Sequence, residues 1–257
     1  METNINCDLG ETSIHTSTDN DSTLLTIVNT ANVACGFHAG DESTMIRTMQ
    51  ISKKNNVSIG AHPSFNDREN FGRKRIKLSS KEINKLILDQ LEIISSIADK
   101  QQCKITHVKP HGALNNMACE DYNLSYDIGT AIKQFNKDLI YMCGAKSEME
   151  KAGNDLNMKV ACEIFADRNY DDYGRLISRD LPHALITNPQ ESLEHIVTML
   201  TEQSIRCYSG KKISCQIDTI CLHSDGITAV PLAKKLKEGL LAEGFELKPL
   251  NTFKKFL

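Results

Sequence analysis

Six short apolar stretches of this chain each end in a reactive polar side chain. They cover residues 5–8, 33–38, 57–62, 105–111, 160–163 and 220–225. The stretches are rich in β-branched residues, are bounded by glycine or proline, and alternate with longer segments of helical periodicity, which is typical of parallel strands. Proteins built in this way assemble their sites at the carboxyl ends of the strands. The pattern therefore indicates an enzyme.

The segments between the apolar stretches have the amphipathic periodicity of helices. Helical patterns cover residues 42–55, 81–99, 124–135, 188–200 and 230–241. Ser79 followed by Glu82 is a capping box that begins the second of these helices, and Asn188 followed by Pro189 is a start signal for the fourth. A further strand over residues 139–144 fits after the third helix.

Strand and helix alternate about seven times along the 257 residues. This alternation leaves two α/β architectures, a closed β/α barrel or an open doubly wound sheet. An open sheet concentrates its ligands at one crevice, whereas here nearly every strand brings polar groups to its end. We therefore expect a single catalytic domain over residues 1–257, folded as a TIM-like β/α barrel of about seven parallel strands.

The composition of the chain argues against a nucleic-acid partner. The formal net charge is −3 and the pI is near 6.2, whereas nucleic-acid binding usually needs a concentrated positive face. The nine cysteines form no C-x-x-C pair and several lie inside apolar runs, which is typical of cytosolic proteins. No apolar run approaches the length of a membrane span, and the first residues lack the features of a signal peptide. We therefore expect a cytoplasmic protein with no membrane partner.

One basic cluster stands out against this background. It comprises Arg68, Arg73, Lys74, Arg75 and Lys77. The cluster fits a solvated loop, and it also fits a clamp for an anion or a phosphate near the site.

The first stretch carries an aspartate at its end. Side chains alternate along a strand, so Asn4, Asn6 and Asp8 share one face, and in a barrel Asp8 would point into the mouth. An aspartate in this position is also a common turn or helix cap. The same two interpretations apply to Asp41, which follows Gly40 and precedes a predicted helix.

The fourth stretch carries two histidines and a lysine. His107, Lys109 and His111 project to one side if the segment stays extended. A lysine is costly to bury without an anionic partner, and Glu163 at the end of the fifth stretch could supply one. Because every buried charge costs several kcal/mol unless it is paired, ionisable groups at the ends of independent strands favour one shared site.

Several standard signatures are missing from the chain. It contains no G-x-x-x-x-G-K-[ST] phosphate-binding loop, no G-x-S-x-G elbow and no H-E-x-x-H motif. A nucleotide, if one binds, is not held by a P-loop.

Six ordered motifs together resemble the LamB/YcsF family of lactam-utilisation proteins, the family of the A subunit of bacterial 5-oxoprolinase. The motifs are N-C-D-L-G-E at 6–11, A-N-V-A-C-G-F-H-A-G-D at 31–41, residues 59–63 with 71–73, H-V-K-P-H-G-A-L-N at 107–115, residues 163–168 with Tyr170, and residues 220–225. They cover nearly the whole chain. Two segments depart from the family pattern: T-S-I-H stands at 12–15, and H-S-D-G stands at 223–226 in place of H-G-D-N.

The resemblance implies a distorted β/α barrel related to the glycoside hydrolase and deacetylase superfamily. It also implies a cytosolic enzyme that acts with two partner subunits, B and C, to open 5-oxo-L-proline to L-glutamate with ATP, accompanied by Mg²⁺, and water. Whether ATP binds this chain or a partner stays open at this stage. Two alternatives also stay open: a metal-dependent deacetylase or hydrolase of the related superfamily, and a non-catalytic lactam-binding subunit.

The motifs give two groups of expected site residues. The catalytic candidates are Asp8, His38, His62, Lys109, His111, Glu163 and His223. The candidates for binding substrate or phosphate are Asn6, Glu11, Asp41, Arg73, Arg168 and Asp225. We expect Lys109 with one or both of His38 and His111 to stabilise an oxyanion or a phosphate, and Asp8 or Glu163 to activate water, with His62 and His223 as second candidates for the same site. If the deacetylase alternative holds, Asp8, His38 and His62 are the expected ligands of a transition metal such as Zn²⁺.

Overall fold

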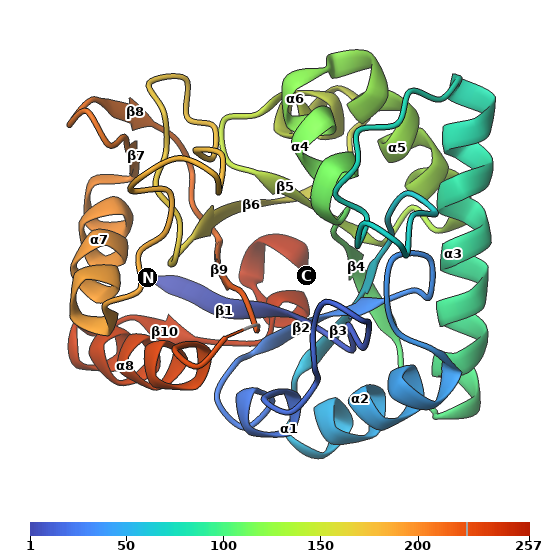
Figure 1. Cartoon of the computed structure of the whole chain (residues 1–257), viewed down its shortest axis with the longest axis horizontal. Helices are drawn as coiled ribbons and strands as arrows, with labels where there is room; N and C mark the ends of the chain where they lie inside the picture. The colour runs from blue at the N-terminus through green and yellow to red at the C-terminus, as the bar shows by residue number, and fades with distance from the viewer. Residues whose placement is uncertain (225) are drawn as a thin grey trace.

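Parallel strands close into a barrel in the computed structural model, which describes residues 1–224 and 226–257 (Figure 1). The strands follow the order β1-β2-β3-β4-β5-β6-β9, and β9 pairs back with β1. Their bounds are β1 (Glu2–Leu9), β2 (Thr30–Ala34), β3 (Ser58–His62), β4 (Ile105–Val108), β5 (Ile140–Gly144), β6 (Lys159–Phe165) and β9 (Thr219–Leu222). Neighbouring strands are parallel throughout. The predicted TIM-like α/β barrel of about seven parallel strands is confirmed.

Helices surround the strands, as Figure 1 shows. They are α1 (Asp21–Leu24), α2 (Glu42–Lys54), α3 (Ser80–Lys100), α4 (Gly112–Glu120), α5 (Tyr122–Phe135), α6 (Glu148–Asp155), α7 (Pro189–Glu202) and α8 (Ala229–Ala242). The capping box of Ser79 and Glu82 is present at the start of α3. Asn188 caps α7 by accepting the backbone N–H groups of Gln190 and Glu191. Both predicted start signals are therefore confirmed, because local hydrogen bonds decide them.

The C-terminal segment closes the amino-terminal end of the barrel. The short helices η1 (Leu250–Thr252) and η2 (Lys254–Phe256) follow β10 (Glu246–Leu247), which pairs with the start of β1. An apolar cluster joins this segment to the barrel interior: Ile140, Met142, Ala161, Leu250, Phe253 and Phe256. The C terminus accordingly lies near the centre of the ring of strands in Figure 1. This end is filled by apolar side chains, so ligands must enter from the other end.

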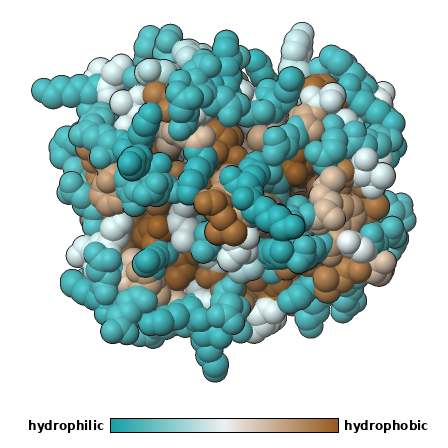
Figure 2. Space-filling view, turned by 180° about the vertical axis from the view of Figure 1, so that it is seen from behind, coloured by the Kyte–Doolittle hydropathy of each residue, from teal (hydrophilic) through white to brown (hydrophobic). Residues whose placement is uncertain are grey.

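Two further strands lie outside the closed sheet. β7 (Ser204–Arg206) and β8 (Lys212–Ser214) form an antiparallel pair outside the closed sheet. Figure 2 shows one face of the molecule, where hydrophilic side chains cover most of the surface and hydrophobic ones gather in smaller areas between them. None of the described helices combines the length and apolarity needed to cross a bilayer.

Candidate active site

A column of polar side chains fills the middle of the barrel. Asn4, Asn6 and Asp8 point inward from β1, as the alternation of a strand requires. Asn6 Nδ2 donates to Thr219 Oγ1 at 2.7 Å, and Thr219 donates to Asn4 Oδ1. Asn32 on β2 donates from Nδ2 to Asn6 Oδ1 and to Asp8 Oδ1, both at 2.8 Å. Buried amides therefore hold the Asp8 carboxylate at the top of the column.

His107 orients this column from β4. Its Nε2 donates to Asn32 Oδ1 at 2.9 Å. Burial, with the nearby charge of Lys109, lowers the pKa of His107 to about 3, so the ring is neutral. Gly60 on β3 makes room for it, because a Cβ there would lie 2.1 Å from His107 Nε2. His107 thus lies below the cavity, as a support for Asn32 and Asp8.

Lys109 lies between two carboxylates and is almost completely buried. Its Nζ is 2.9 Å from Asp8 Oδ1, 2.9 Å from Glu163 Oε1 and 3.0 Å from Cys221 Sγ. Burial disfavours the ammonium, but Asp8 and Glu163 outweigh it and raise the pKa of Lys109 well above its ordinary value. Burial raises the pKa of Glu163, against the opposing effect of Lys109. The centre therefore holds a charged lysine whose stronger anionic partner is Asp8.

Asp8 stays ionised in this setting. Burial alone would raise its pKa, but His62 and Lys109 hold the pKa of Asp8 well below its ordinary value. Asp8 Oδ2 lies 3.3 Å from His62 Nε2. One oxygen of the carboxylate thus faces the lysine and the other faces a cluster of histidines.

That cluster comprises Glu11, His38, His62 and His111, and is called here the histidine cluster. His62 Nδ1 donates to the carbonyl oxygen of Lys109 at 2.7 Å, and His111 Nε2 donates to the carbonyl oxygen of Phe71 at 3.0 Å. Glu11 Oε1 lies 3.0 Å from His38 Nε2, 3.1 Å from His111 Nδ1 and 3.7 Å from His62 Nε2. One donor atom from each of the four buried residues falls within 4.8 Å of the others.

The electrostatics of the histidine cluster differ from ring to ring. Burial and the neighbouring His111 lower the pKa of His38 to about 3. Burial opposes a charge on His62, but Asp8 and Glu11 raise its pKa. Despite its burial, Glu11 has a pKa far below the ordinary value, because His111 and His38 lie against it. Three imidazoles and one ionised carboxylate are a donor set that suits a divalent transition metal.

The opposite wall of the site comes from β9 and from the segment after β6. His223 donates from Nδ1 to Asp167 Oδ2 at 2.7 Å, and its backbone N–H reaches the same oxygen at 3.2 Å. Arg168 donates from Nη2 to the carbonyl oxygen of Ile177 at 2.6 Å. Its Nε is buried and has no hydrogen-bond partner among the residues that the structure describes. This donor is well suited to meet an anionic ligand.

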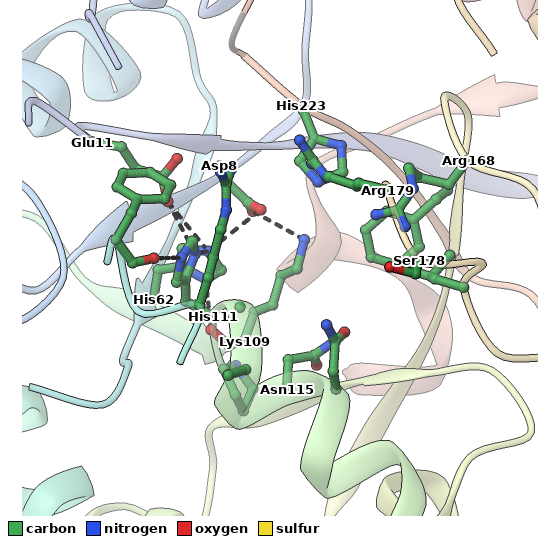
Figure 3. Close-up of a pocket in the computed structure, with 18 residues that line it drawn as sticks. Asp8, Glu11, His62, Lys109, His111, Asn115, Arg168, Ser178, Arg179 and His223 are labelled. Atoms are coloured by element: carbon green, nitrogen blue, oxygen red, sulfur yellow. Dashed lines mark hydrogen bonds and ion pairs between the residues drawn. The ribbon is translucent and has the colours of Figure 1, made fainter. Parts of the chain in front are cut away.

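The two walls enclose a cavity of about 240 Å³. Figure 3 shows Asp8, Glu11, His62, Lys109 and His111 on one side of it, and Arg168, Ser178, Arg179 and His223 on the other. A neighbouring cavity of about 460 Å³ lies beyond Phe165 and includes Glu163 in its lining. The two cavities share the lining residues Asn115, Asn116, Phe165, Leu176 and Ser178.

The structure brings most of the sequence-predicted residues to this cavity. Those that line it are Asp8, Glu11, His62, Arg73, Lys109, His111, Arg168 and His223. His38 lies behind Glu11, and Glu163 lies behind Lys109 in the second cavity. Asn6 is buried below Asp8 and contacts other side chains of the barrel interior.

The two remaining predicted residues are Asp41 and Asp225. Asp41 is exposed and caps α2 by accepting the backbone N–H of Thr44 at 2.8 Å, so the helix-cap interpretation describes it and it does not belong to the cavity lining. Asp225 lies outside the described residues. The metal set expected from the sequence, Asp8 with His38 and His62, also differs from the cluster that forms, because Glu11 and not Asp8 lies among all three imidazoles.

The residues of the basic cluster around Arg73 do not all lie at the cavity. Arg73 lines the cavity. Arg68 instead donates to the carbonyl oxygens of Gly36 and Gly40, and Arg75 pairs with Glu120. One member of the cluster therefore reaches the site, while these two hold loops in place.

Sequence reasoning missed several residues of the site. Asn32 could have been found, because it points to the same side of β2 as the barrel interior and lies within a recognised motif. Asp167 also lies inside a motif, next to Arg168. Ser178 and Arg179 belong to a long segment without periodicity, so no local signal places them at the cavity.

The fold and the site together define a β/α-barrel protein with a polar, charged cavity at the carboxyl ends of its strands. The sequence profile of the LamB/YcsF family matches residues 3–255, and the chain belongs to this family. Among its relatives, the A subunit of 5-oxoprolinase from Staphylococcus haemolyticus is 38% identical over 250 residues, which are 97% of this chain and 100% of the relative. The corresponding protein of Natranaerobius thermophilus, of the same name, is 39% identical over 249 residues, which are 97% of each chain.

A solved structure supports the same relationship. The lactam utilization protein from Thermus thermophilus superimposes with a TM-score of 0.89 at 30% sequence identity, covering 96% of this chain and 99% of that one. Deacetylase barrels also share the fold at much lower identity. The chain therefore matches a lactam-utilisation protein over nearly all of its residues.

Proposed function

We propose that this chain is the A subunit of an ATP-dependent 5-oxoprolinase, which hydrolyses the lactam 5-oxo-L-proline to L-glutamate together with subunits B and C. The names of its relatives support this assignment. The observation that carries it furthest is the two-sided cavity, with arginines on one wall and the Asp8–Lys109 pair on the other. 5-Oxoproline likewise has two ends, a carboxylate and an amide, so it can lie between the walls with each end matched.

The carboxylate end belongs against the arginine wall. Arg168 offers its buried Nε, and Arg179 and Ser178 lie beside it. Guanidinium groups bind carboxylates through parallel, charge-assisted hydrogen bonds. The lactam then points toward Lys109 and Asp8. This orientation explains why both arginine and carboxylate side chains line one small cavity.

The chemistry explains why ATP is needed. Amide resonance weakens the carbonyl as an electrophile, and the amine freed from a five-membered ring stays tethered to the carboxylate that it left. Tethered nucleophiles reach effective molarities on the order of 10⁵ M or more, so ring closure competes strongly. Phosphorylation of the amide oxygen by ATP, with Mg²⁺, would turn the carbonyl carbon into a better electrophile and drive the reaction forward.

The residues of the cavity then take the following roles. Lys109 stabilises the negative charge that develops on the amide oxygen or its phosphate. Asp8 orients the attacking water and accepts its proton as the water oxygen adds to the phosphorylated carbonyl carbon. The ring C–N bond then breaks to leave a glutamyl phosphate, and a second water releases inorganic phosphate and L-glutamate. His223, held by Asp167, delivers a proton to the departing ring nitrogen. We place the activity in the cytoplasm, in keeping with nine cysteines that are all free.

The test is ATP-dependent release of glutamate from 5-oxo-L-proline by the chain alone and by the chain with subunits B and C. We expect turnover only in the complex. Asp8→Asn should lower that turnover by roughly 10² to 10⁴-fold while the fold is kept, because a positioned acid or base contributes about this much. Unchanged turnover would remove Asp8 from the mechanism. Binding of ATP with Mg²⁺, measured on this chain and on the complex, locates the nucleotide.

A second candidate function is favoured by the histidine cluster. A metal-dependent hydrolase of acetylated amines would use the same cavity, and deacetylases share the barrel at low identity. This candidate predicts metal-dependent release of acetate from an acetylated amino sugar without ATP. A third candidate, a non-catalytic lactam-binding subunit, predicts that Lys109→Met leaves the turnover of the complex unchanged.

A further inference from the structure

We propose that Glu11, His38, His62 and His111 form a binding site for one divalent transition-metal ion, with an open coordination position that faces the cavity. The directions of the ring nitrogens and the distances between the donor atoms are those of such a site. Such a site does not depend on the reaction assigned above, because a metal ion can bind whether the substrate is a lactam or not.

The tautomers of two rings follow from their backbone partners. His62 Nδ1 and His111 Nε2 each lie within hydrogen-bond distance of a carbonyl oxygen, at 2.7 Å and 3.0 Å. A carbonyl oxygen only accepts, so each of these nitrogens must carry the proton. In the neutral rings the other nitrogens, His62 Nε2 and His111 Nδ1, therefore present lone pairs. They are the atoms that face each other at 3.0 Å.

Two lone pairs at this distance need a positive charge between them. A carboxylate oxygen, Glu11 Oε1, also points at the same place, 3.1 Å from His111 Nδ1. Three acceptor atoms thus converge on one point, in an interior where unpaired polar atoms are costly. A proton on His62 Nε2 would serve some of these contacts, whereas a metal ion would serve them all.

The distances between the donor atoms match those between the ligand atoms of a metal site. Ligand bonds of about 2.0 to 2.1 Å at tetrahedral angles place neighbouring donor atoms roughly 3.3 Å apart. The distances here are 3.0, 3.0, 3.1 and 3.7 Å. Imidazole nitrogens with one carboxylate select Zn²⁺ and its neighbours Co²⁺, Fe²⁺ and Ni²⁺ over Mg²⁺ or Ca²⁺.

The groups around His62 and His111 orient the two rings in the way that the hydrogen-bond partners of metal ligands do. Ligand histidines of metal sites usually donate their second ring N–H to a carbonyl or a carboxylate, and His62 and His111 both do so. The turn that carries the Phe71 carbonyl needs Gly72, whose φ is +62° and whose added Cβ would lie 2.2 Å from Ser64 Oγ. The backbone is thus shaped to bring this acceptor against His111.

The site opens on one side only. Glu11, His62 and His111 line the cavity, whereas His38 is completely buried and stacks on His111 with ring centroids 3.8 Å apart. Phe71 packs edge-on against both rings and excludes water from that side. A bound ion would accordingly face the cavity, where such an ion can act as a Lewis acid toward a carbonyl oxygen.

The test is a metal-binding measurement on the whole chain, stripped with a chelator and dialysed. We expect one equivalent of Zn²⁺ to bind, as measured by competition with a chromogenic chelator. We also expect one equivalent of Co²⁺ to give visible d–d absorption typical of nitrogen and oxygen ligands. A chain that binds no stoichiometric metal and shows no such absorption overturns the proposal.

Variants assign the ligands. Glu11→Gln, His62→Gln and His111→Gln should each weaken binding about 100-fold or more, since loss of outer-shell groups alone costs 10 to 100-fold. His183→Gln, at an exposed histidine outside the cluster, is the matched control and should bind as the wild type does. Wild-type affinity in all three cluster variants overturns the assignment, and circular dichroism verifies that each variant is folded.

Asp8→Asn separates this proposal from the proposed function. Asp8 is not among the four donors but contacts His62 as an outer-shell group, so the variant should keep one equivalent of metal, with affinity weakened by no more than about 10 to 100-fold, while glutamate formation falls. Metal binding without lactam hydrolysis in the wild-type complex would reject the function and keep the site. Hydrolysis of the lactam by a complex that binds no metal at equilibrium would keep the proposed function and reject the metal site.

Discussion

The two ends of this barrel have opposite interiors although the same strands build both. At the amino-terminal end, Leu250, Phe253 and Phe256 of the C-terminal segment pack on Ile140 and Met142 and fill the space with apolar atoms. At the carboxyl-terminal end, charged and polar groups fill it, and several of them pair: Lys109 with Asp8 and Glu163, and His62 with Asp8. Burial of apolar atoms thus stabilises one end, whereas at the other end pairing offsets the cost of burying charges.

The contrast between the two ends indicates where function can lie. An apolar plug needs only shape and volume, so it can be replaced by other apolar residues. A buried ion pair depends on every member, because the loss of one leaves an uncompensated charge. We therefore expect mutations at the polar end to change turnover as well as stability, and mutations at the apolar end to change stability alone, even where both cost a similar free energy of unfolding.

The largest effect is expected for Lys109→Met. This change leaves Asp8 and Glu163 facing each other without the ammonium that joins them. Breaking a buried pair in this way costs about 3 to 5 kcal/mol of unfolding free energy, and turnover of the proposed enzyme should be lost as well. Urea unfolding measures the first and glutamate release the second. The matched control is Lys85→Met, whose side chain is 75% exposed and pairs with Asp89 on the surface, and it should cost less than about 0.5 kcal/mol.

Phe253→Ala tests the other end. Removing a buried aromatic ring should cost about 3 to 5 kcal/mol of unfolding free energy, through lost burial and the cavity that remains. Turnover per folded molecule, however, should stay at the wild-type level, because the ring lies in the apolar cluster and not in the cavity. If turnover per folded molecule falls as it does in Lys109→Met, the two ends are not separate and the comparison fails.

The smallest effect is expected for Asp21→Asn, which probes pH dependence at the polar end. Asp21 Oδ2 accepts the backbone N–H of Gly10 at 2.8 Å, and burial raises its pKa to about 7. A raised folded-state pKa means that the contribution of Asp21 to stability is present below pH about 3.9 and is lost as pH rises toward 7.

The asparagine variant has no such titration. Relative to the wild type it should therefore gain roughly 1 kcal/mol or more of unfolding free energy at pH 8 compared with pH 5. Thermal or urea unfolding at the two pH values measures this difference. An identical pH dependence in the two proteins would contradict the raised pKa of Asp21.

The sequence-based predictions are most accurate where contacts between residues close in the chain decide the structure. The capping box at Ser79 and Glu82 and the proline after Asn188 set helix starts through contacts three residues apart or fewer, so the sequence contains all the information needed. The sequence does not predict the helix α6, because its eight residues are too few to show a clear apolar period. The sequence leaves the cap role of Asp41 open, since a cap and a ligand require the same residue type.

By itself the sequence determined that strands and helices alternate and that each strand ends in a group capable of chemistry, because residue type and spacing decide both. Only the tertiary structure decided which groups meet. Closure of β9 onto β1 brings Cys221 and His223 to the same mouth as Asp8, and the segments that follow β1, β2 and β4 put Glu11, rather than Asp8, among the three imidazoles. The physical reason is that pairing energies depend on distances of a few ångströms between residues far apart in the chain, and those distances exist only once the barrel has closed.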